Sequence, residues 1–153
     1  MSGKRALLVS ACLLGENCKY SGGNNALPPE ALAALEERFR LVSVCPEREG
    51  GLPTPRVPSE RQGSRVVNRE GEDVTEAFRT GAALTLKRAE EEGCRLALLK
   101  ERSPSCGSSL IYDGSFTGTV VPGEGVTAEL LKSHGLSVCG ENSLERLEKE
   151  FAI

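Results

Sequence analysis

Four short apolar segments along the chain predict the strands of a sheet. They occupy residues 5–10, 40–44, 95–99 and 136–139. None of them alternates strictly between apolar and polar positions, as a strand with one solvent-facing side would. Continuous apolar runs of this length are typical of parallel strands that helices cover on both faces.

Helical segments are predicted between and after these strands. They occupy residues 29–38, 73–92, 127–134 and, as a last amphipathic piece, 143–151. The first begins with Pro29, which the first helical turn tolerates because the missing N–H has no partner there in any case. The second begins with Asp73 and has Glu76 three residues later, which is the pattern of a capping box, and it ends at Gly93.

The order of these elements is a strand followed by a helix, repeated four times, which predicts an α/β fold. We expect a Rossmann-like, doubly wound and mainly parallel sheet of four strands, flanked by helices and joined by right-handed crossovers. A chain of 153 residues supports one domain, so residues 1–153 are expected to form a single domain.

Three connections between the predicted elements are unusually long. They are residues 11–28, 45–72 and 100–126, and each follows the carboxyl end of a predicted strand. Loops longer than about 12–15 residues in a compact domain are usually functional. Because ligands of open parallel sheets bind outside the carboxyl ends of the strands, we expect the functional site in these loops.

Composition excludes several classes of function. The chain has 19 Lys and Arg against 22 Asp and Glu, a net charge of −3, and only 4% aromatic residues. We therefore expect no nucleic-acid partner, because the chain offers neither a basic excess for phosphates nor a stacking platform for bases. His134 is the only histidine, so a mechanism or metal site built on several histidines is nearly excluded.

The lengths of the apolar runs also indicate where in the cell the protein is located. None approaches the roughly 20 residues of a membrane-spanning helix, so no membrane partner is expected. The first strand supplies only a short apolar run before Ser10, too short for the core of a secretory signal. These two features predict a cytoplasmic protein.

The six cysteines carry the main chemical signal. Cys12 follows the first predicted strand, Cys45 follows the second, and Cys106 lies in the loop after the third. If these strands are neighbours, about 4.8 Å apart, the three thiols converge on one rim of the sheet. Clustered thiols in a reducing compartment indicate metal binding or catalysis. Cys94 and Cys139 are interpreted as small buried hydrophobic residues.

Three convergent thiols are compatible with several ligands. A structural zinc ion prefers four ligands, so it would need Cys18 as the fourth, since the chain has no C-x-x-C pair. Iron–sulfur clusters are held by thiolates and tolerate dispersed ligands. A cubane held by only three cysteines leaves one iron open to act as a Lewis acid. Unrelated buried thiols are the remaining interpretation.

Polar residues beside the second and third of these cysteines are candidates for catalysis. Glu47 lies in the segment CPE, and Ser103 opens the segment SPSCGSS. Each also has an ordinary interpretation, Glu47 as a solvated loop acid and Ser103 as the start of a turn with Pro104 at its second position. Arg48 and Arg56 are interpreted as surface charges.

Several strings in the chain resemble the motifs of the thiouracil desulfidase family. They are SACLLG at residues 10–15, followed by Cys18, CPE at 45–47, GGLPTPR at 50–56, DVT at 73–75 and SPSCG at 103–107. The strings occur in order from the first strand to the helix at Gly125. The resemblance therefore covers most of the chain and is more specific than any single motif.

The resemblance implies a [4Fe-4S] enzyme that removes sulfur from thiouracil without net redox chemistry, acting on a small thionated pyrimidine. The cluster ligands that it implies are Cys12, Cys45 and Cys106, with one iron left open, and the catalytic residues are Glu47 and Ser103. Cys18 matches the opening motif but lies outside this ligand set.

Two alternatives remain open at this stage. One is a sulfurtransferase that carries a persulfide on a nucleophilic cysteine, for which Cys106 in its Gly- and Ser-rich loop is the candidate. The other is a metal-binding or sulfide-binding module without catalytic activity.

Overall fold

The computed structural model describes residues 4–143. Its central feature is a four-stranded sheet in which all neighbouring strands are parallel, in the order β2-β1-β5-β8. The predicted strands are confirmed, and the bounds differ from those expected by no more than one residue. They are β1 (Arg5–Ser10), β2 (Phe39–Val44), β5 (Leu96–Leu99) and β8 (Ser137–Gly140).

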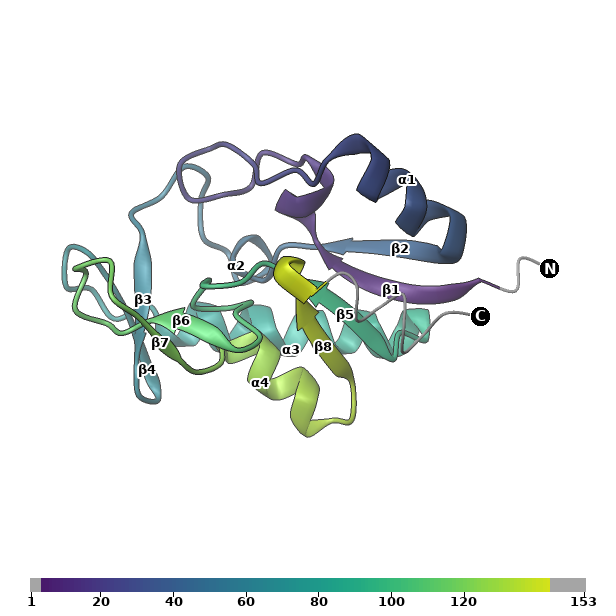
Figure 1. Cartoon of the computed structure of the whole chain (residues 1–153). Coiled ribbons are helices and arrows are strands. Elements are labelled where there is room, and N and C mark those ends of the chain that lie inside the picture. Colours follow the sequence, from purple (N-terminus) through teal and green to yellow (C-terminus); the bar gives the residue numbers. More distant parts are fainter. Residues whose placement is uncertain (1–3, 144–153) are drawn as a thin grey trace.

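Helices cover both faces of this sheet (Figure 1). One face carries α1 (Pro29–Arg38), and the other carries α3 (Thr75–Glu92) and α4 (Val126–Ser133). The α/β class, the parallel sheet and the flanking helices are therefore as the sequence predicts.

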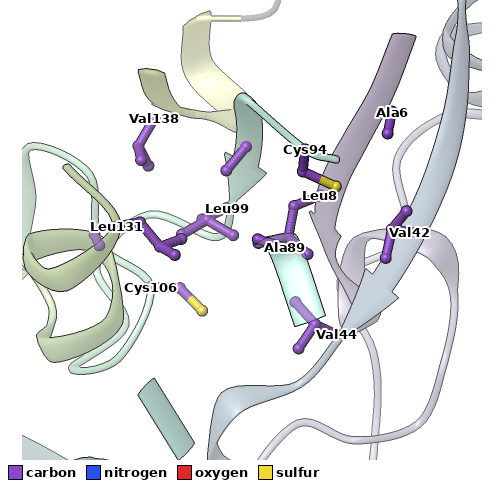
Figure 2. Packing of buried hydrophobic residues seen from close by; sticks show 12 residues of the cluster. Ala6, Leu8, Val42, Val44, Ala89, Cys94, Leu99, Cys106, Leu131 and Val138 are labelled. Atoms are coloured by element: carbon purple, nitrogen blue, oxygen red, sulfur yellow. The ribbon is translucent and has the colours of Figure 1, made fainter. Parts of the chain in front are cut away.

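The central strand β1 supplies both hydrophobic layers, because successive side chains of a strand point to opposite faces. Leu7 and Val9 pack in the cluster that contains Leu35 of α1. Leu8 packs in the second cluster, which includes Ala89 of α3 and Leu131 of α4 and is drawn in Figure 2. Both layers are buried, which is why the strands read as continuous apolar runs rather than as alternating ones.

The carboxyl ends of the strands lie together at one edge of the sheet. Ser10, the last residue of β1, is in register with Val44, the last residue of β2. The Ser10 hydroxyl accepts a hydrogen bond of 2.9 Å from the backbone N–H of Lys100, the first residue after β5. The loops that follow β1, β2 and β5 consequently start from neighbouring points.

These long loops contain structure that the sequence analysis did not predict. One holds the short helix α2 (Pro46–Glu49) and the antiparallel hairpin of β3 (Ser59–Gln62) and β4 (Arg65–Asn68). Another holds the hairpin of β6 (Leu110–Tyr112) and β7 (Val120–Pro122). The two hairpins lie side by side beyond the sheet edge (Figure 1).

The helix starts also differ from expectation. The helix α3 begins at Thr75, and the residue before it, Val74, offers no capping side chain, so the predicted capping box of Asp73 and Glu76 is wrong. Instead the Asp73 carboxylate accepts the N–H of Thr75, because a short acidic side chain readily bonds the backbone two residues on. The predicted amphipathic piece at 143–151 lies almost wholly outside the described residues. None of the helices within residues 4–143 is long and apolar enough to cross a membrane.

Two glycines let α2 lie directly against α3. A Cβ atom on Gly81 of α3 would collide with the carbonyl of Pro46, and one on Gly50 would collide with the carbonyl of Ala77. This contact fixes the segment that follows β2, and with it the cysteine and glutamate of the CPE motif.

We expect Gly81→Ala to lower the free energy of unfolding by about 1–3 kcal/mol, the usual cost of overpacking a tight contact. Urea unfolding measures the effect. Gly23→Ala is the matched control, because a Cβ there would meet only an ordinary contact with Ser21. Equal stability of the two variants would contradict the close approach of α2 and α3.

Candidate active site

A cavity of about 530 Å³ lies at the carboxyl edge of the sheet. Its walls come from the loops after β1, β2 and β5 and from the two hairpins. The cavity is lined by all five residues that the sequence suggested as cluster ligands or catalytic residues: Cys12, Cys45, Glu47, Ser103 and Cys106. The structure therefore brings together residues that are up to 94 positions apart in the chain.

Two of the cysteines reach the cavity from neighbouring strands. Cys12 lies in a 3₁₀ turn (Ala11–Leu14) directly after β1, and Cys45 is the residue that precedes α2. Cys18 also lines the cavity and packs against both of them in a small cluster with Ala11. The sequence does not decide whether Cys18 joins the other cavity cysteines. In the structure Cys18 is only 2% exposed and lies beside Cys45.

The third cysteine reaches the cavity from the loop that follows β5. Cys106 is buried within the hydrophobic layer between the sheet and α4, near Leu99 and Val44 (Figure 2). Cys94 belongs to the same layer but lies two residues before β5, at the amino end of the strand, and it does not line the cavity. The interpretation of Cys94 as a small buried residue agrees with this position. Cys139 is likewise buried, in the hydrophobic layer on the other face of the sheet.

The cavity thiols differ in acidity. A hydrogen bond from the Cys18 side chain lowers the pKa of Cys45, although burial opposes this effect. Burial raises the pKa of Cys106 to about 12. Burial also raises the pKa of Cys12, where a hydrogen bond from the Asn25 side chain acts in the opposite direction. Because metal centres bind thiolates, ligation at Cys12 and Cys106 requires each thiol to lose its proton.

Glu47 is fixed at both carboxylate oxygens. Its Oε1 accepts a hydrogen bond of 3.1 Å from Nε of Arg56, and its Oε2 accepts one of 3.1 Å from the hydroxyl of Ser105. The Arg56 side chain is only 7% exposed, so its interpretation as a surface charge is wrong, whereas Arg48 is 44% exposed. Arg56 also donates to the carbonyl of Cys18 at 3.0 Å, which ties the first loop to the second.

Ser103 is part of a tight turn that leads to Cys106. Its Oγ accepts the backbone N–H groups of Ser105 and Cys106, each at 3.1 Å. The Oγ atoms of Ser103 and Ser105 are 2.9 Å apart. The turn predicted at Pro104 is therefore present, and it places the Ser103 hydroxyl at the cavity wall.

A buried carboxylate closes the loop that carries Ser103 and Cys106. Oε1 of Glu101 accepts the backbone N–H groups of Ser108 at 2.8 Å, Ser109 at 3.0 Å and Leu110 at 3.3 Å. Its Oε2 accepts the Ser109 hydroxyl at 2.9 Å. A Cβ on Gly140 of β8 would collide with this side chain, so the sheet leaves room for it. No motif in the sequence points to Glu101.

These bonds make the Glu101 contribution to stability depend on pH. Burial opposes ionisation, but the hydrogen bonds from Ser109, Leu110 and Ser108 outweigh it, and the pKa of the carboxyl lies below its ordinary 4.5. A carboxylate with a lower pKa in the folded state stabilises the fold above its unfolded pKa, and this stabilisation is lost as the pH falls.

We expect Glu101→Gln to be less stable than the wild type at pH 7 and to lose less stability on acidification below about pH 4.5. Urea unfolding at a series of pH values measures both effects. Glu91→Gln, a change at an exposed position of α3, should follow the wild-type profile. If Glu101→Gln follows that profile too, the carboxylate does not hold the loop.

The donor set of the cavity distinguishes between metal centres. Within residues 4–143, no three His, Cys, Asp or Glu side chains are placed to hold a single metal ion. A zinc ion requires all of its thiolates about 2.3 Å from one point. In a four-iron cluster each thiolate bonds a different iron, and cysteines around a cavity are the donor type that such clusters take.

Comparison with known proteins identifies the family. The model of the 2-thiouracil desulfurase family matches residues 7–143, which is nearly the whole described chain. This chain belongs to the 2-thiouracil desulfurase family. The family resemblance inferred from the cysteine motifs is thereby confirmed.

Two relatives show how far the family likeness extends. YbbK of Bacillus subtilis (strain 168) is 44% identical, over 90% of this chain and 97% of YbbK. The solved structure of the [4Fe-4S]-dependent thiouracil desulfidase TudS is 47% identical and superposes with a TM-score of 0.93. That match covers 97% of this chain and 99% of TudS, so the loops and hairpins around the cavity belong to the shared fold.

Proposed function

We propose that this protein removes sulfur from thiouracil, giving uracil and hydrogen sulfide, with a [4Fe-4S] cluster bound in the cavity. The observation that carries this proposal is the match to TudS, a [4Fe-4S]-dependent thiouracil desulfidase, at 47% identity over nearly the whole of both chains. The cavity supports it, because it gathers cysteine thiols, a carboxylate and a hydroxyl in one place.

Cys12, Cys45 and Cys106 are the residues that would hold the cluster. They line the cavity from three different loops, and hydrogen-bond donors lie next to two of their sulfur atoms. Asn25 Nδ2 is 3.5 Å from Sγ of Cys12, and Ser105 Oγ is 3.5 Å from Sγ of Cys106. When bound, a cluster with one open iron supplies a soft Lewis acid that accepts a thione sulfur.

Glu47 is the proposed general base. Its carboxylate lies at the cavity wall, with one oxygen held by Arg56 and the other by Ser105. The ion pair with Arg56 fixes the direction of the carboxylate. Glu47 takes a proton from water, and the resulting hydroxide adds to the thione carbon of the substrate.

Ser103 is the proposed hydrogen-bond partner of the substrate. Its Oγ already accepts two backbone N–H groups, so its own proton is available for donation. That proton can be offered to a ring nitrogen or to the departing sulfur, both of which gain electron density as the carbon–sulfur bond breaks.

The remaining walls of the cavity suit a small planar substrate. Both tyrosines of the chain, Tyr20 and Tyr112, line the cavity together with Phe116. Aromatic faces stack on nucleobase rings. A cavity of about 530 Å³ falls in the usual size range of small-molecule sites, which agrees with the proposed substrate class, a thionated pyrimidine.

The cysteines also support the proposed cytoplasmic location. Cys12, Cys18, Cys45 and Cys106 form no disulfide. Thiols of this kind persist in reducing compartments.

An anaerobic assay with thiouracil tests the proposal. We expect the thione absorbance to fall while uracil and sulfide appear in equal amounts. Unchanged thiouracil in the presence of the intact cluster would contradict the proposal. A persulfide on Cys106, trapped by alkylation, without any uracil would instead indicate a sulfurtransferase.

A further inference from the structure

Ser105 lies between the two residues proposed to carry the chemistry. Its side chain is only 1% exposed. Its Oγ is 3.1 Å from Oε2 of Glu47 and 2.9 Å from Oγ of Ser103. No other described side chain hydrogen-bonds both, so Ser105 alone links the carboxylate to the Ser103 hydroxyl.

The direction of these hydrogen bonds follows from what each group can donate. Ser103 Oγ accepts two backbone N–H groups, so its remaining part in the contact with Ser105 is that of donor. The Ser105 hydroxyl then accepts from Ser103 and has a single proton to donate. It donates this proton to the Glu47 carboxylate, which can only accept and is 3.1 Å away, rather than to Sγ of Cys106 at 3.5 Å. The three groups form a chain in which the protons point from Ser103 toward Glu47.

The backbone holds Ser105 firmly in this position. Its carbonyl accepts the N–H groups of Thr127 at 2.8 Å and Ala128 at 3.1 Å, in the first turn of α4. A Cβ on Gly125, just before this helix, would collide with the Ser105 carbonyl carbon. The start of α4 therefore fixes the backbone of Ser105, whose hydroxyl is buried away from solvent.

We propose that Ser105 is a positioning residue that couples Glu47 to Ser103 during desulfuration; this inference rests on the proposed function. When Glu47 takes a proton from water, its carboxyl becomes a donor, and the Ser105 hydroxyl turns to accept from it. Ser105 then no longer accepts from Ser103, and the Ser103 proton is released toward the substrate.

The protons balance in this sequence. Water loses one proton to Glu47 as its oxygen bonds the thione carbon. The carbon–sulfur bond breaks with the electron pair on sulfur, and Ser103 gives its proton to the departing sulfur. The Ser103 oxygen then takes the proton of Ser105, which in turn takes the proton held by Glu47. The second water proton leaves the added hydroxyl as the carbonyl forms and completes hydrogen sulfide. Thiouracil and water thus give uracil and hydrogen sulfide, with no oxidant or reductant.

Ser105→Ala tests this coupling in the cluster-containing protein. We expect unchanged iron content and visible spectrum, an unchanged KM for thiouracil, and a kcat lower by up to about 10²-fold, because Glu47 and Ser103 lose their common anchor. Ser108→Ala is the matched control. Its hydroxyl is buried in the same loop but bonds only the carbonyl of Val138, so its kcat should stay at the wild-type value.

Two further measurements separate coupling from a merely structural effect. Ser105→Thr, which keeps the hydroxyl, should recover most of kcat. Ser105→Ala should lower kcat much less in Glu47→Gln than in the wild type, because the chain is already broken there. A wild-type kcat in Ser105→Ala, or the full loss appearing again in the Glu47→Gln background, would overturn the coupling while leaving the desulfurase function intact. Absence of thiouracil turnover in the wild type would overturn the function itself.

Discussion

Replacing Cys12, Cys45 or Cys106 by serine is expected to remove both the iron and the desulfurase activity. Each of the three lines the same cavity from a different loop, so the other two proposed ligands cannot take the place of the one that is lost. A serine hydroxyl is a poor ligand for iron in such clusters, which are held by thiolates. Iron and sulfide analysis of anaerobically purified variants, with a thiouracil assay on the same samples, measures both losses.

The other cysteines provide the controls. Cys94 precedes β5, lies outside the cavity and packs in the hydrophobic layer, so Cys94→Ser should cost stability while keeping iron and activity. Cys18 lines the cavity next to Cys45 and is the sharper comparison. We expect Cys18→Ser to retain its iron. Complete loss of iron in Cys18→Ser would show a four-cysteine site without an open iron and would contradict the three-ligand proposal.

Glu47→Gln is expected to separate cluster and substrate binding from turnover. The amide keeps the size of the side chain and part of its hydrogen bonding, but it cannot accept a proton from water. A positioned general base typically contributes about 10²–10⁴-fold to a rate. We therefore expect a normally coloured cluster, near-normal thiouracil binding and a kcat reduced by about this factor, measured by anaerobic steady-state kinetics.

Ser103→Ala is the comparison for the loss of kcat expected in Glu47→Gln. It should reduce kcat less than Glu47→Gln does, because water can replace a hydroxyl as a donor to the substrate more readily than it can replace a base. Should Glu47→Gln turn over at the wild-type rate with its cluster intact, the base is not Glu47.

The parts of the fold that follow from local sequence were predictable. Each strand of the sheet is a short apolar run because both of its faces are buried, as Leu7 and Leu8 on opposite faces of β1 show. Parallel strands share one carboxyl edge, so the placement of Cys12 and Cys45 after two successive strands was sufficient to bring them to one cavity. The proposed roles of Glu47 and Ser103 came from the family resemblance.

The hairpins at the cavity rim were not predictable from the same signals. Strand β3 is four polar residues long, and the apolar strand β6 has only three residues, so neither carries an apolar run long enough to predict a strand. They are held by contacts between distant segments. Oε1 of the buried Glu60 in β3 accepts the N–H groups of Gly114 at 2.9 Å and Phe116 at 3.1 Å in the β6–β7 loop.

The residues that hydrogen-bond Glu47 were not predicted, for a similar reason. Arg56 appears in a polar loop, and only the folded structure shows that its guanidinium is buried against Glu47. Ser105 is one of four serines within seven residues, and nothing in the sequence distinguishes it. Its importance arises from the distance to Glu47, which lies 58 positions away in the chain.

The most direct test of the central claim is to measure iron, acid-labile sulfide and thiouracil turnover on one anaerobic sample as cluster is progressively removed and rebuilt. We predict that turnover rises in proportion to cluster content and reaches its full value when each chain holds one [4Fe-4S] cluster, with sulfide and uracil formed in equal amounts. Turnover at the full rate in colourless, iron-free protein would contradict the claim that this chain is a cluster-dependent thiouracil desulfurase.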